Sequence, residues 1–365
     1  MLLVVNSGSS SLKLAVFAGL DLQAQAHVDR IGSGGPPDHA QALRQGLAQL
    51  NLSGGAVKGA AHRVVHGGAS LTRTCRLTPR VRQTIHDCAG LAPLHNPPAL
   101  AGIDAVADLW PDLPQFAAFD TAFHAGNPEV ATTYALPLAE RERGLRRYGF
   151  HGLSYAAIVR KVQEMTGSRL PERMLSFHLG NGASACAIEK GRSVASSMGF
   201  SPLDGLTMGT RPGGLDPAVV LYLVACHGPE ATGQMLNRAS GLVALGGSND
   251  MRALHAAGTQ EAGFAIAHFC YWAARHGASL CAAMGGLDAI TFTGGIGEND
   301  AIIRAGIVKH LAFLGPVLDG EANARGERAL HKPTSKVAIW IVPADEERQI
   351  AIEVAACQTE EEGQR

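Results

Sequence analysis

Residues 2–17 read LLVVNSGSSSLKLAVF, two apolar runs separated by a turn rich in glycine and serine. This pattern predicts a β-hairpin with strands at Leu2–Val5 and Leu12–Phe17 and a turn at Asn6–Ser11. Small turn residues let backbone N–H groups approach an anion, and Lys13 supplies positive charge. The segment lacks the GK[ST] ending of a Walker A loop, and a strand follows it where that loop would lead into a helix. An ordinary hairpin turn and a phosphate-binding loop are therefore both open interpretations.

Residues 174–188, MLSFHLGNGASACAI, repeat this arrangement later in the chain. They predict a strand at Met174–Leu179, a glycine–serine turn at Gly180–Ser184 and a second strand at Ala185–Ile188. Glycines on both sides of Asn181 can form a concave group of N–H donors that binds an anion.

Two further correspondences follow the hairpins in the same order. The predicted strands Ala61–Val65 and Ala289–Phe292 each lead into a pair of glycines, and Gln115–Phe119 and Lys336–Val342 each lead toward carboxylates. Strands followed by glycine turns are common in any α/β protein, but three matches in one order favour an internal duplication. Each half is then a mixed sheet with helices, and ligands of such folds bind at strand ends.

Composition narrows the class of protein. At 365 residues the chain exceeds the ~250–300 residues at which single cores stop growing, so we expect two domains. Lys and Arg number 31 and Asp and Glu 32, a net charge of −1 that gives no attraction to nucleic acid or to an anionic membrane. The seven cysteines have no CxxC spacing, so we expect neither disulfides nor structural zinc.

Neither a signal peptide nor a membrane span is expected. No basic segment precedes the short apolar run Leu2–Val5. The longest apolar stretch, Ala262–Met284, contains Arg275 and two histidines and is more typical of a buried helix. A cytoplasmic enzyme is the expectation.

A third glycine cluster, TGGIGEN at residues 293–299, follows a predicted strand, and a helix is expected to start near Glu298. Such a helix start suits the ribose and phosphates of a nucleotide.

Several charged residues lie beside glycines, prolines or the ends of predicted strands. Arg63 lies in HRVVHGG and Arg211 in GTRPGG, where a guanidinium can grip phosphate or carboxylate, although a surface arginine in a turn is the commoner case. Asp120 and Glu346 follow apolar strands and could hold Mg²⁺, or be ordinary loop residues. His151, in RYGFHG, is equally consistent with a donor to phosphate and with a structural role.

Taken together, these segments resemble the acetokinase family, within the superfamily of actin, heat-shock chaperone ATPases and sugar kinases. The matching segments span nearly the whole chain in family order: NSGSSSLK, HRVVHGG, PLHNPP, FDTAFH, RRYGFHG, HLGNGAS, SMGFSPLDGLTMGTRPG, NDMR, FTGGIGEN and VPADEE. The resemblance implies an α/β fold of two duplicated ribonuclease-H-like domains, each a mixed sheet flanked by helices, around a nucleotide cleft. The expected domains are residues 1–121, completed by a C-terminal helix at about 348–365, and residues 122–347.

The resemblance also implies roles for individual residues. The implied catalytic residues are Asp120, His151, Arg211 and Arg63. The implied nucleotide site comprises Lys13, His178, Leu179, Gly180, Asn181, Gly182, Asp250, Met251, Arg252, Gly295, Ile296, Gly297, Glu298 and Asn299. Arg63 is implied to bind the substrate carboxylate, with Val65, Leu94, Phe150 and Pro202 around the acyl group, and Asn6 and Glu346 to associate with the metal.

The implied activity is reversible transfer of the γ-phosphoryl group of ATP to acetate, by direct in-line transfer with Mg²⁺ or alternatively Mn²⁺. The implied partners are ATP, ADP, acetate and acetyl phosphate, together with a second copy of the chain. Propionate or butyrate is an open alternative acceptor, because one methylene changes discrimination by only ~1–3 kcal/mol. A chaperone-like or actin-like ATPase is the alternative from another class.

The chain departs from the family pattern at several positions. Leu153 and Tyr155 replace Thr and His, and Ala195, Gly214 and Ala344 replace polar residues. None of these changes removes an implied catalytic group.

Overall fold

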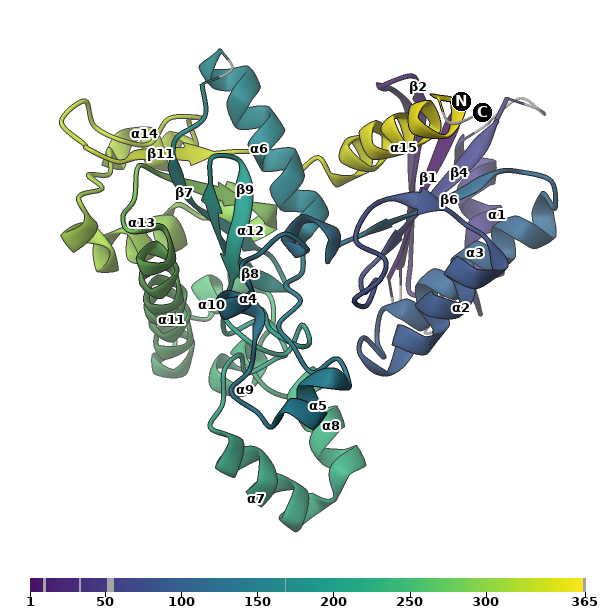
Figure 1. Cartoon of the computed structure of the whole chain (residues 1–365). Helices are drawn as coiled ribbons and strands as arrows, with labels where there is room; N and C mark the ends of the chain where they lie inside the picture. Colours follow the sequence, from purple (N-terminus) through teal and green to yellow (C-terminus); the bar gives the residue numbers. More distant parts are fainter. Residues whose placement is uncertain (9–10, 33, 51–55, 168, 364–365) are drawn as a thin grey trace. The chain divides into compact units, whose positions relative to one another are not determined.

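The computed structural model describes residues 1–8, 11–32, 34–50, 56–167 and 169–363. The chain forms two compact units (Figure 1). Unit 1 comprises Met1–Ala125, Phe150–Ala157 and Asp345–Arg365, and unit 2 comprises Gly126–Gly149 and Ile158–Ala344. The family-implied limits at residues 121 and 347 stay predictions.

Unit 1 is a six-stranded sheet flanked by helices. Its strands are β1 (Leu2–Ser7), β2 (Ser11–Ala18), β3 (Asp21–Asp29), β4 (Gly59–Val64), β5 (Cys75–Arg76) and β6 (Gln115–Phe119), in the order β3-β2-β1-β4-β6-β5. Its helices are α1 (His39–Leu50), α2 (Pro79–Asp87), η1 (Cys88–Gly90), α3 (Asn96–Leu109), η2 (Ala122–His124), the start of α6 (Gly152–Thr166) and α15 (Glu346–Gly363).

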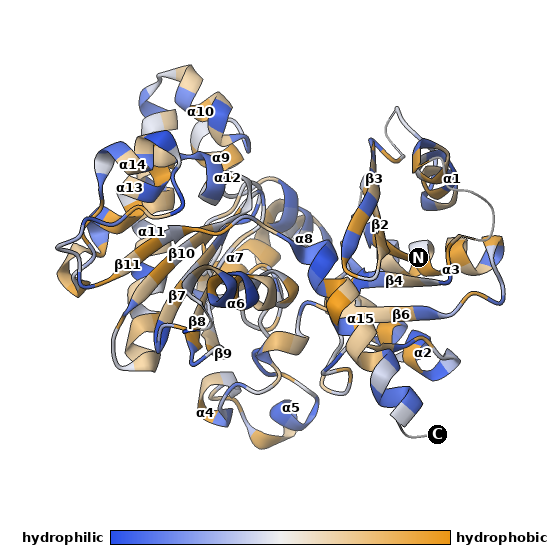
Figure 2. Ribbon diagram, turned by 90° about the horizontal axis from the view of Figure 1, so that it is seen from above, coloured by the Kyte–Doolittle hydropathy of each residue, from blue (hydrophilic) through white to orange (hydrophobic). Residues whose placement is uncertain are grey.

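Alternating side chains of β1 give unit 1 a core on each face of its sheet. Leu3 and Val5 pack with Leu43 of α1 on one face, whereas Val4 packs with Ile350 of α15 on the other. Successive strand residues point to opposite faces, so an uninterrupted apolar run fits a strand covered on both sides. Figure 2 shows hydrophobic colours concentrated on the central strands.

Unit 2 is a five-stranded sheet flanked by helices. Its strands are β7 (Arg173–Leu179), β8 (Ala183–Glu189), β9 (Arg192–Ser196), β10 (Ala289–Thr293) and β11 (Ala338–Ile341), in the order β11-β10-β7-β8-β9. Its helices are α4 (Glu129–Thr132), α5 (Leu138–Glu142), the end of α6, α7 (Pro217–His227), α8 (Pro229–Arg238), α9 (Leu242–Gly246), α10 (Met251–Ala257), α11 (Gln260–Met284), α12 (Gly294–Asn299), α13 (Ala301–His310), η3 (Ala312–Leu314) and α14 (Gly320–Arg325).

Five strands of the unit 1 sheet have the same topology as the five strands of unit 2, and β5 is an addition at the edge of unit 1. In unit 1, β1, β2 and β3 pair antiparallel, and β1, β4 and β6 pair parallel. In unit 2, β7, β8 and β9 pair antiparallel, and β7, β10 and β11 pair parallel. The predicted α/β class with two mixed sheets flanked by helices is confirmed, and the repeated strand order follows the hairpin correspondence seen in the sequence.

Some predicted boundaries are wrong. The expected turn at Asn6–Ser11 begins too early, because β1 continues through Ser7 and Asn6 pairs with Lys13 of β2. The helix expected near Glu298 begins at Gly294, since the glycine cluster itself forms α12. Ser9 and Ser10 of the first candidate loop lie outside the described residues.

The predicted buried helix at Ala262–Met284 is confirmed as α11, which lies against the sheet of unit 2. A Cβ atom at Gly277 would lie 2.7 Å from the Phe177 ring, so glycine permits this close approach. In the part of the chain that the structure describes, no helix combines the length and apolar character that a bilayer span requires.

Candidate active site

Three predicted residues of unit 1 meet because parallel strands end at one edge of a sheet. Asn6 lies on β1, Arg63 lies on β4, and Asp120 follows β6 directly. The Asp120 N–H donates to the Val64 carbonyl at 3.0 Å, which continues the ladder one residue past the strand. The carboxyl edge of a parallel sheet is where such folds bind ligands.

Arg63 is the centre of this cluster. Its Nε donates to Asp120 Oδ1 at 3.0 Å and its Nη2 to Asp120 Oδ2 at 2.6 Å, a bidentate ion pair. Its Nη1 donates to Asn6 Oδ1 at 3.3 Å, and Nε lies 3.7 Å from Glu346 Oε2. The structure therefore brings together four predicted residues: Asn6 and Glu346, predicted for the metal, Arg63, predicted for the substrate carboxylate, and Asp120, predicted as catalytic.

Burial governs the electrostatics of this cluster. The Asp120 side chain is 1% exposed and that of Arg63 is 20% exposed. Burial disfavours the charged guanidinium, but the carboxylates of Asp120 and Glu346 outweigh that effect and raise the pKa of Arg63 above its ordinary value. Arg63 therefore stays a cation, and Asp120 fixes the plane in which its guanidinium lies.

His151 is held against Asp120 by backbone geometry. The Gly152 N–H donates to the Asp120 carbonyl at 2.8 Å, and a Cβ atom at Gly152 would overlap that oxygen. His151 itself has φ of 56°, in the left-handed region that few residues other than glycine adopt. Such backbone strain concentrates at functional sites. Gly152, the second glycine of the GFHG segment, is thus required for the chain to pass close to the Asp120 carbonyl.

Phe150 and Val65, predicted for the acyl group, are both buried, at 1% and 8% exposure. The Phe150 carbonyl accepts from His124 Nε2 at 2.9 Å. The Phe150 ring contacts the His66 ring edge-on, with 5.4 Å between the ring centroids. His66 directly follows Val65, so the structure places the two predicted segments together. Leu94, partly buried, lies in the loop before α3.

Arg211 and Pro202 lie in unit 2. Arg211 Nη1 donates to the Pro202 carbonyl at 2.8 Å, which brings these two predicted residues together. Burial lowers the pKa of Arg211 to about 10, and among the described residues no carboxylate forms an ion pair with it. A partly buried cation without a neutralising partner is a strong candidate for binding an anion.

A pocket of about 1090 Å³ in unit 2 collects most of the predicted nucleotide residues. The predicted residues that line it are Gly180, Asn181, Asp250, Met251, Arg252, Gly295, Ile296 and Asn299. They come from three segments: the β7–β8 turn, the start of α10, and α12. Gly294 permits the chain to turn from β10 into α12 close to β7. Its φ is 79°, and a Cβ atom at this position would lie 2.7 Å from the Leu179 carbonyl.

The remaining predicted nucleotide residues lie elsewhere. Leu179 is fully buried in β7, and the Gly297 carbonyl accepts from a buried arginine. Glu298 Oε1 accepts from the N–H groups of Gly294 and Ala344 at 3.0 and 2.9 Å, so it caps α12. Lys13 is exposed on β2 of unit 1. His178 lies near the end of β7 and Gly182 ends the β7–β8 turn, and neither lines the pocket.

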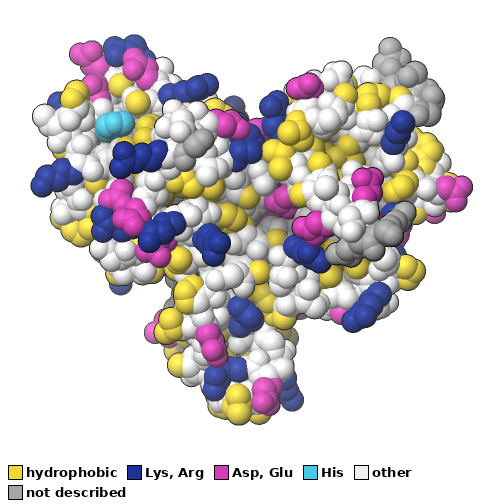
Figure 3. All heavy atoms as spheres, turned by 45° about the horizontal axis from the view of Figure 1, so that its top comes forward, with side chains coloured by type: hydrophobic (Ala, Val, Ile, Leu, Met, Phe, Trp, Pro, Cys, Tyr) yellow, Lys and Arg dark blue, Asp and Glu magenta, His cyan; other side chains and the backbone are white. Residues whose placement is uncertain are grey.

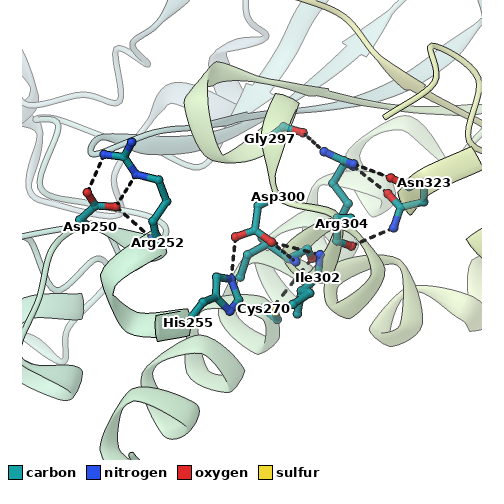
Figure 4. A network of polar contacts seen from close by, with 11 residues as sticks. Asp250, Arg252, His255, Cys270, Gly297, Asp300, Ile302, Arg304 and Asn323 are labelled. Carbon is teal, nitrogen blue, oxygen red and sulfur yellow. Dashed lines mark hydrogen bonds and ion pairs between the residues drawn. The ribbon is translucent and has the colours of Figure 1, made fainter. Parts of the chain in front are cut away.

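Sequence reasoning missed six pocket residues: Asn249, His255, Ala256, Asp300, Ala301 and Ile302. Asp300 Oδ1 accepts from Ile302 N and Ile303 N at 3.0 Å, and its Oδ2 lies 2.7 Å from His255 Nε2 (Figure 4). An aspartate directly before the apolar run of α13 is a readable helix N-cap signal. The His255 contact has no counterpart in local sequence.

The departures from the family pattern are accommodated locally. Leu153 and Tyr155 are fully buried, and the Tyr155 ring stacks on Phe123 at 6.5 Å between ring centroids.

On the face shown in Figure 3, basic and acidic side chains are interspersed.

Comparison with known proteins identifies the family. The model of the acetokinase family matches residues 32–352. The acetate kinase of Pseudomonas aeruginosa is 43% identical, over 97% of this chain and 98% of its own length. The acetate kinase of Rhodopseudomonas palustris is 42% identical, over 96% of both chains.

Solved structures agree. A Porphyromonas gingivalis acetate kinase superposes with a TM-score of 0.87 at 34% identity, covering 98% of this chain and 99% of its own. A Francisella tularensis propionate kinase superposes with a TM-score of 0.90 at 34% identity, covering 96% of this chain and 98% of its own. The family resemblance seen in the sequence is thereby confirmed, and the chain belongs to the acetokinase family.

Proposed function

We propose that this protein transfers the γ-phosphoryl group of ATP to acetate, giving acetyl phosphate and ADP, and that the reaction is reversible. The observation that carries the proposal is the Arg63–Asp120 pair at the carboxyl edge of the unit 1 sheet. It supplies a permanent, oriented cation suited to an anionic acceptor. The acetate kinases among the relatives support acetate as that acceptor.

The nucleotide is assigned to the unit 2 pocket. Its volume suits a nucleoside triphosphate in part or whole, since ligand pockets commonly measure ~300–1000 Å³. Glycines at positions 180 and 295 leave room for the phosphates and ribose, and Met251 and Ile296 offer apolar surface for the base.

In the proposed reaction, a carboxylate oxygen of acetate forms a bond to the γ-phosphorus while the bond from that phosphorus to the bridging oxygen of ADP breaks. Acetate is ionised at neutral pH, so no general base has to remove a proton. Both oxygens of Asp120 already accept from Arg63. We therefore assign Asp120 to orienting Arg63 for an anionic acceptor.

Arg211 and His151 are assigned to the moving phosphoryl group. Negative charge spreads over its equatorial oxygens during transfer, and preorganised donors stabilise that charge. The burial of Arg211 without an ion-pair partner supports this assignment, as does the strained backbone of His151 beside Asp120.

A divalent metal is implied by the family, and the residues present fit it. The Asn6 and Glu346 oxygens both reach the Arg63 guanidinium, at 3.3 and 3.7 Å. Among the described residues no three His, Cys, Asp or Glu side chains form a complete metal site. Mg²⁺ commonly uses one or two protein oxygens with phosphate and water, so Asn6 and Glu346 would hold Mg²⁺, or Mn²⁺, together with the nucleotide. When bound, the metal would neutralise phosphate charge.

Acyl length is proposed to be two carbons, with Val65, Leu94, Phe150 and Pro202 around the methyl group. The propionate kinase among the solved relatives keeps propionate as a second candidate. Comparison of kcat/KM for acetate, propionate and butyrate decides between them.

We also propose that two copies associate through α7. This helix, PAVVLYLVACH, has no buried residue, and Leu221 and Tyr222 are 71% and 69% exposed. Such an apolar surface is typical of an interface.

A cytoplasmic location is proposed because ATP is the phosphoryl donor.

The test measures ADP formation with and without acetate, and ATP formation from ADP and acetyl phosphate. We expect ADP formation to depend on acetate and on Mg²⁺, and the reverse reaction to proceed. Acetate-independent ADP formation without the reverse reaction would overturn the proposal in favour of an ATPase.

A further inference from the structure

Arg304, on α13, is a buried cation whose role the proposed reaction does not explain. Its side chain is 1% exposed and is among the largest fully buried ones in unit 2. A buried guanidinium is costly unless its donors are satisfied. Burial lowers the pKa of Arg304, with Asp300 opposing that shift. The contacts of its guanidinium therefore decide what this buried cation does.

The hydrogen bonds of Arg304 all lead to carbonyl oxygens (Figure 4). Nη1 donates to Gly297 O at 3.0 Å and to Glu298 O at 2.9 Å. Nε and Nη2 donate to the side-chain and main-chain oxygens of Asn323, at 2.8 and 3.0 Å. The geometry is that of a clamp on the main chain.

The clamped segment is α12, which runs from Gly294 to Asn299. A helix of this length is marginal by itself, and its last carbonyls have no partner within the helix. Glu298 Oε1 caps its first turn by accepting from Gly294 N, and Arg304 takes the carbonyls of its last turn. Side chains therefore hold α12 at both ends.

Asn323, on α14, extends the clamp. It is 4% exposed, and its Nδ2 donates to the Ala301 carbonyl at 2.8 Å. Arg304 and Asn323 thus fix the main chain on both sides of Asp300.

This clamped stretch forms one wall of the unit 2 pocket. The lining residues that it contributes are Gly295, Ile296, Asn299, Asp300, Ala301 and Ile302. Arg304 lies behind the wall and is not itself among the lining residues. A direct contact between Arg304 and a ligand in the pocket is therefore not part of its role.

We propose that Arg304, supported by Asn323, is a positioning residue that sets the shape of α12 for binding a nucleoside di- or triphosphate. The proposal rests on the assignment of the unit 2 pocket to the nucleotide. It predicts an effect on the nucleotide alone, because the acceptor residues Arg63 and Asp120 lie in unit 1.

The test compares Arg304→Met, which keeps length and loses all donors, with Arg304→Lys, which keeps the charge and some donors. Lys309→Met, at an exposed position of α13, is the matched control. We expect Arg304→Met to raise the KM for ATP and the Kd for ADP by about tenfold or more, with the KM for acetate within about twofold of wild type. Arg304→Lys should recover part of the lost nucleotide affinity, and Lys309→Met should change none of the three constants.

Equal changes in both KM values, or none, would overturn the proposal. If Arg304→Met does not fold, Arg304→Lys decides by the same criterion. Failure of the proposed function is distinguishable, since wild-type protein would then form no acetyl phosphate from ATP and acetate. Failure of this inference leaves that activity intact and gives wild type and Arg304→Met the same Kd for ADP.

Discussion

At the scale of single residues, Arg211 carries the most specific prediction. Arg211→Ala should lower kcat by about a hundred- to a thousandfold, the usual loss for one preorganised donor to a developing charge. Nucleotide affinity should stay within about twofold, because Arg211 does not line the unit 2 pocket. Steady-state kinetics and ADP titration provide the measurement, with exposed Arg192→Ala as control. Near-normal kcat in Arg211→Ala would remove the residue from the proposed reaction.

Asp120 offers a comparison between two bidentate pairs of one chain. Arg63–Asp120 is buried, whereas Arg82–Asp104 has the same two-bond geometry with side chains 45% and 47% exposed. Loss of one partner from a buried pair leaves an uncompensated charge and typically costs ~3–5 kcal/mol, against at most ~1 kcal/mol for an exposed pair. Asp120→Asn keeps part of the hydrogen bonding, so we expect a smaller loss, about 1–3 kcal/mol.

Urea unfolding of Asp120→Asn and Asp104→Asn measures this difference, and kinetics should show a loss of kcat only in Asp120→Asn. Equal destabilisation of the two variants would contradict the role given to the buried pair.

At the scale of elements, Gly294 joins β10 to α12. Gly294→Ala should lower the free energy of unfolding by about 1–3 kcal/mol, because alanine there is strained and its Cβ meets the Leu179 carbonyl. It should also weaken ADP binding, since the same junction shapes the pocket. Gly320→Ala, which has open space around its Cβ at the start of α14, is the control and should be neutral or slightly stabilising. Chemical unfolding and calorimetry test both effects.

The elements also show how far sequence reasoning reaches. Apolar runs with glycine turns predicted the two hairpins, because most residues of these strands are buried and the apolar pattern is enough to specify them. The start of α12 was missed because glycine disfavours helix. The contacts that override this preference are side-chain hydrogen bonds, from Gly294 N to Glu298 and from Arg304 to the Gly297 carbonyl, and the glycine-rich pattern does not reveal them.

The same reason separates the site residues that were found from those that were missed. Arg63, Asp120 and Arg211 stand beside glycines or strand ends, where local sequence marks them. Arg304 and His255 lie inside ordinary helices, and only the fold brings them to Gly297 and Asp300.

At the scale of the whole molecule, two buried histidines of unit 1 set a pH dependence of stability. Burial lowers the pKa of His62 to about 4, despite its hydrogen bond with Gln115, and burial lowers that of His124 to about 4 as well. The unfolded chain binds these protons at its ordinary pKa near 6.5. The unfolded state therefore holds more protons between pH 6.5 and 4, and stability falls as the pH falls through that range.

Each histidine should contribute a loss of up to ~3 kcal/mol. Urea unfolding from pH 7.5 to 4.5 measures the slope, and His62→Gln and His124→Gln should each flatten it. A profile that is unchanged in both variants would exclude these groups as its origin.

Association of two copies also belongs to this scale. Replacement of Leu221 and Tyr222 by aspartate should convert a dimer to a monomer, because charges on α7 oppose burial of an apolar surface. Light scattering coupled to gel filtration measures the mass, with an exposed change on α5, Leu138→Asp, as control. A wild-type monomer would contradict the proposal at once.

The central claim is that a carboxylate accepts the phosphoryl group. Incubation with ATP, Mg²⁺, acetate and hydroxylamine tests it directly, because hydroxylamine converts an acyl phosphate into a stable hydroxamate. We predict acetohydroxamate in amounts equal to the ADP formed, and none without acetate. Release of ADP and inorganic phosphate with no hydroxamate would contradict the claim and indicate an ATPase of the chaperone or actin type.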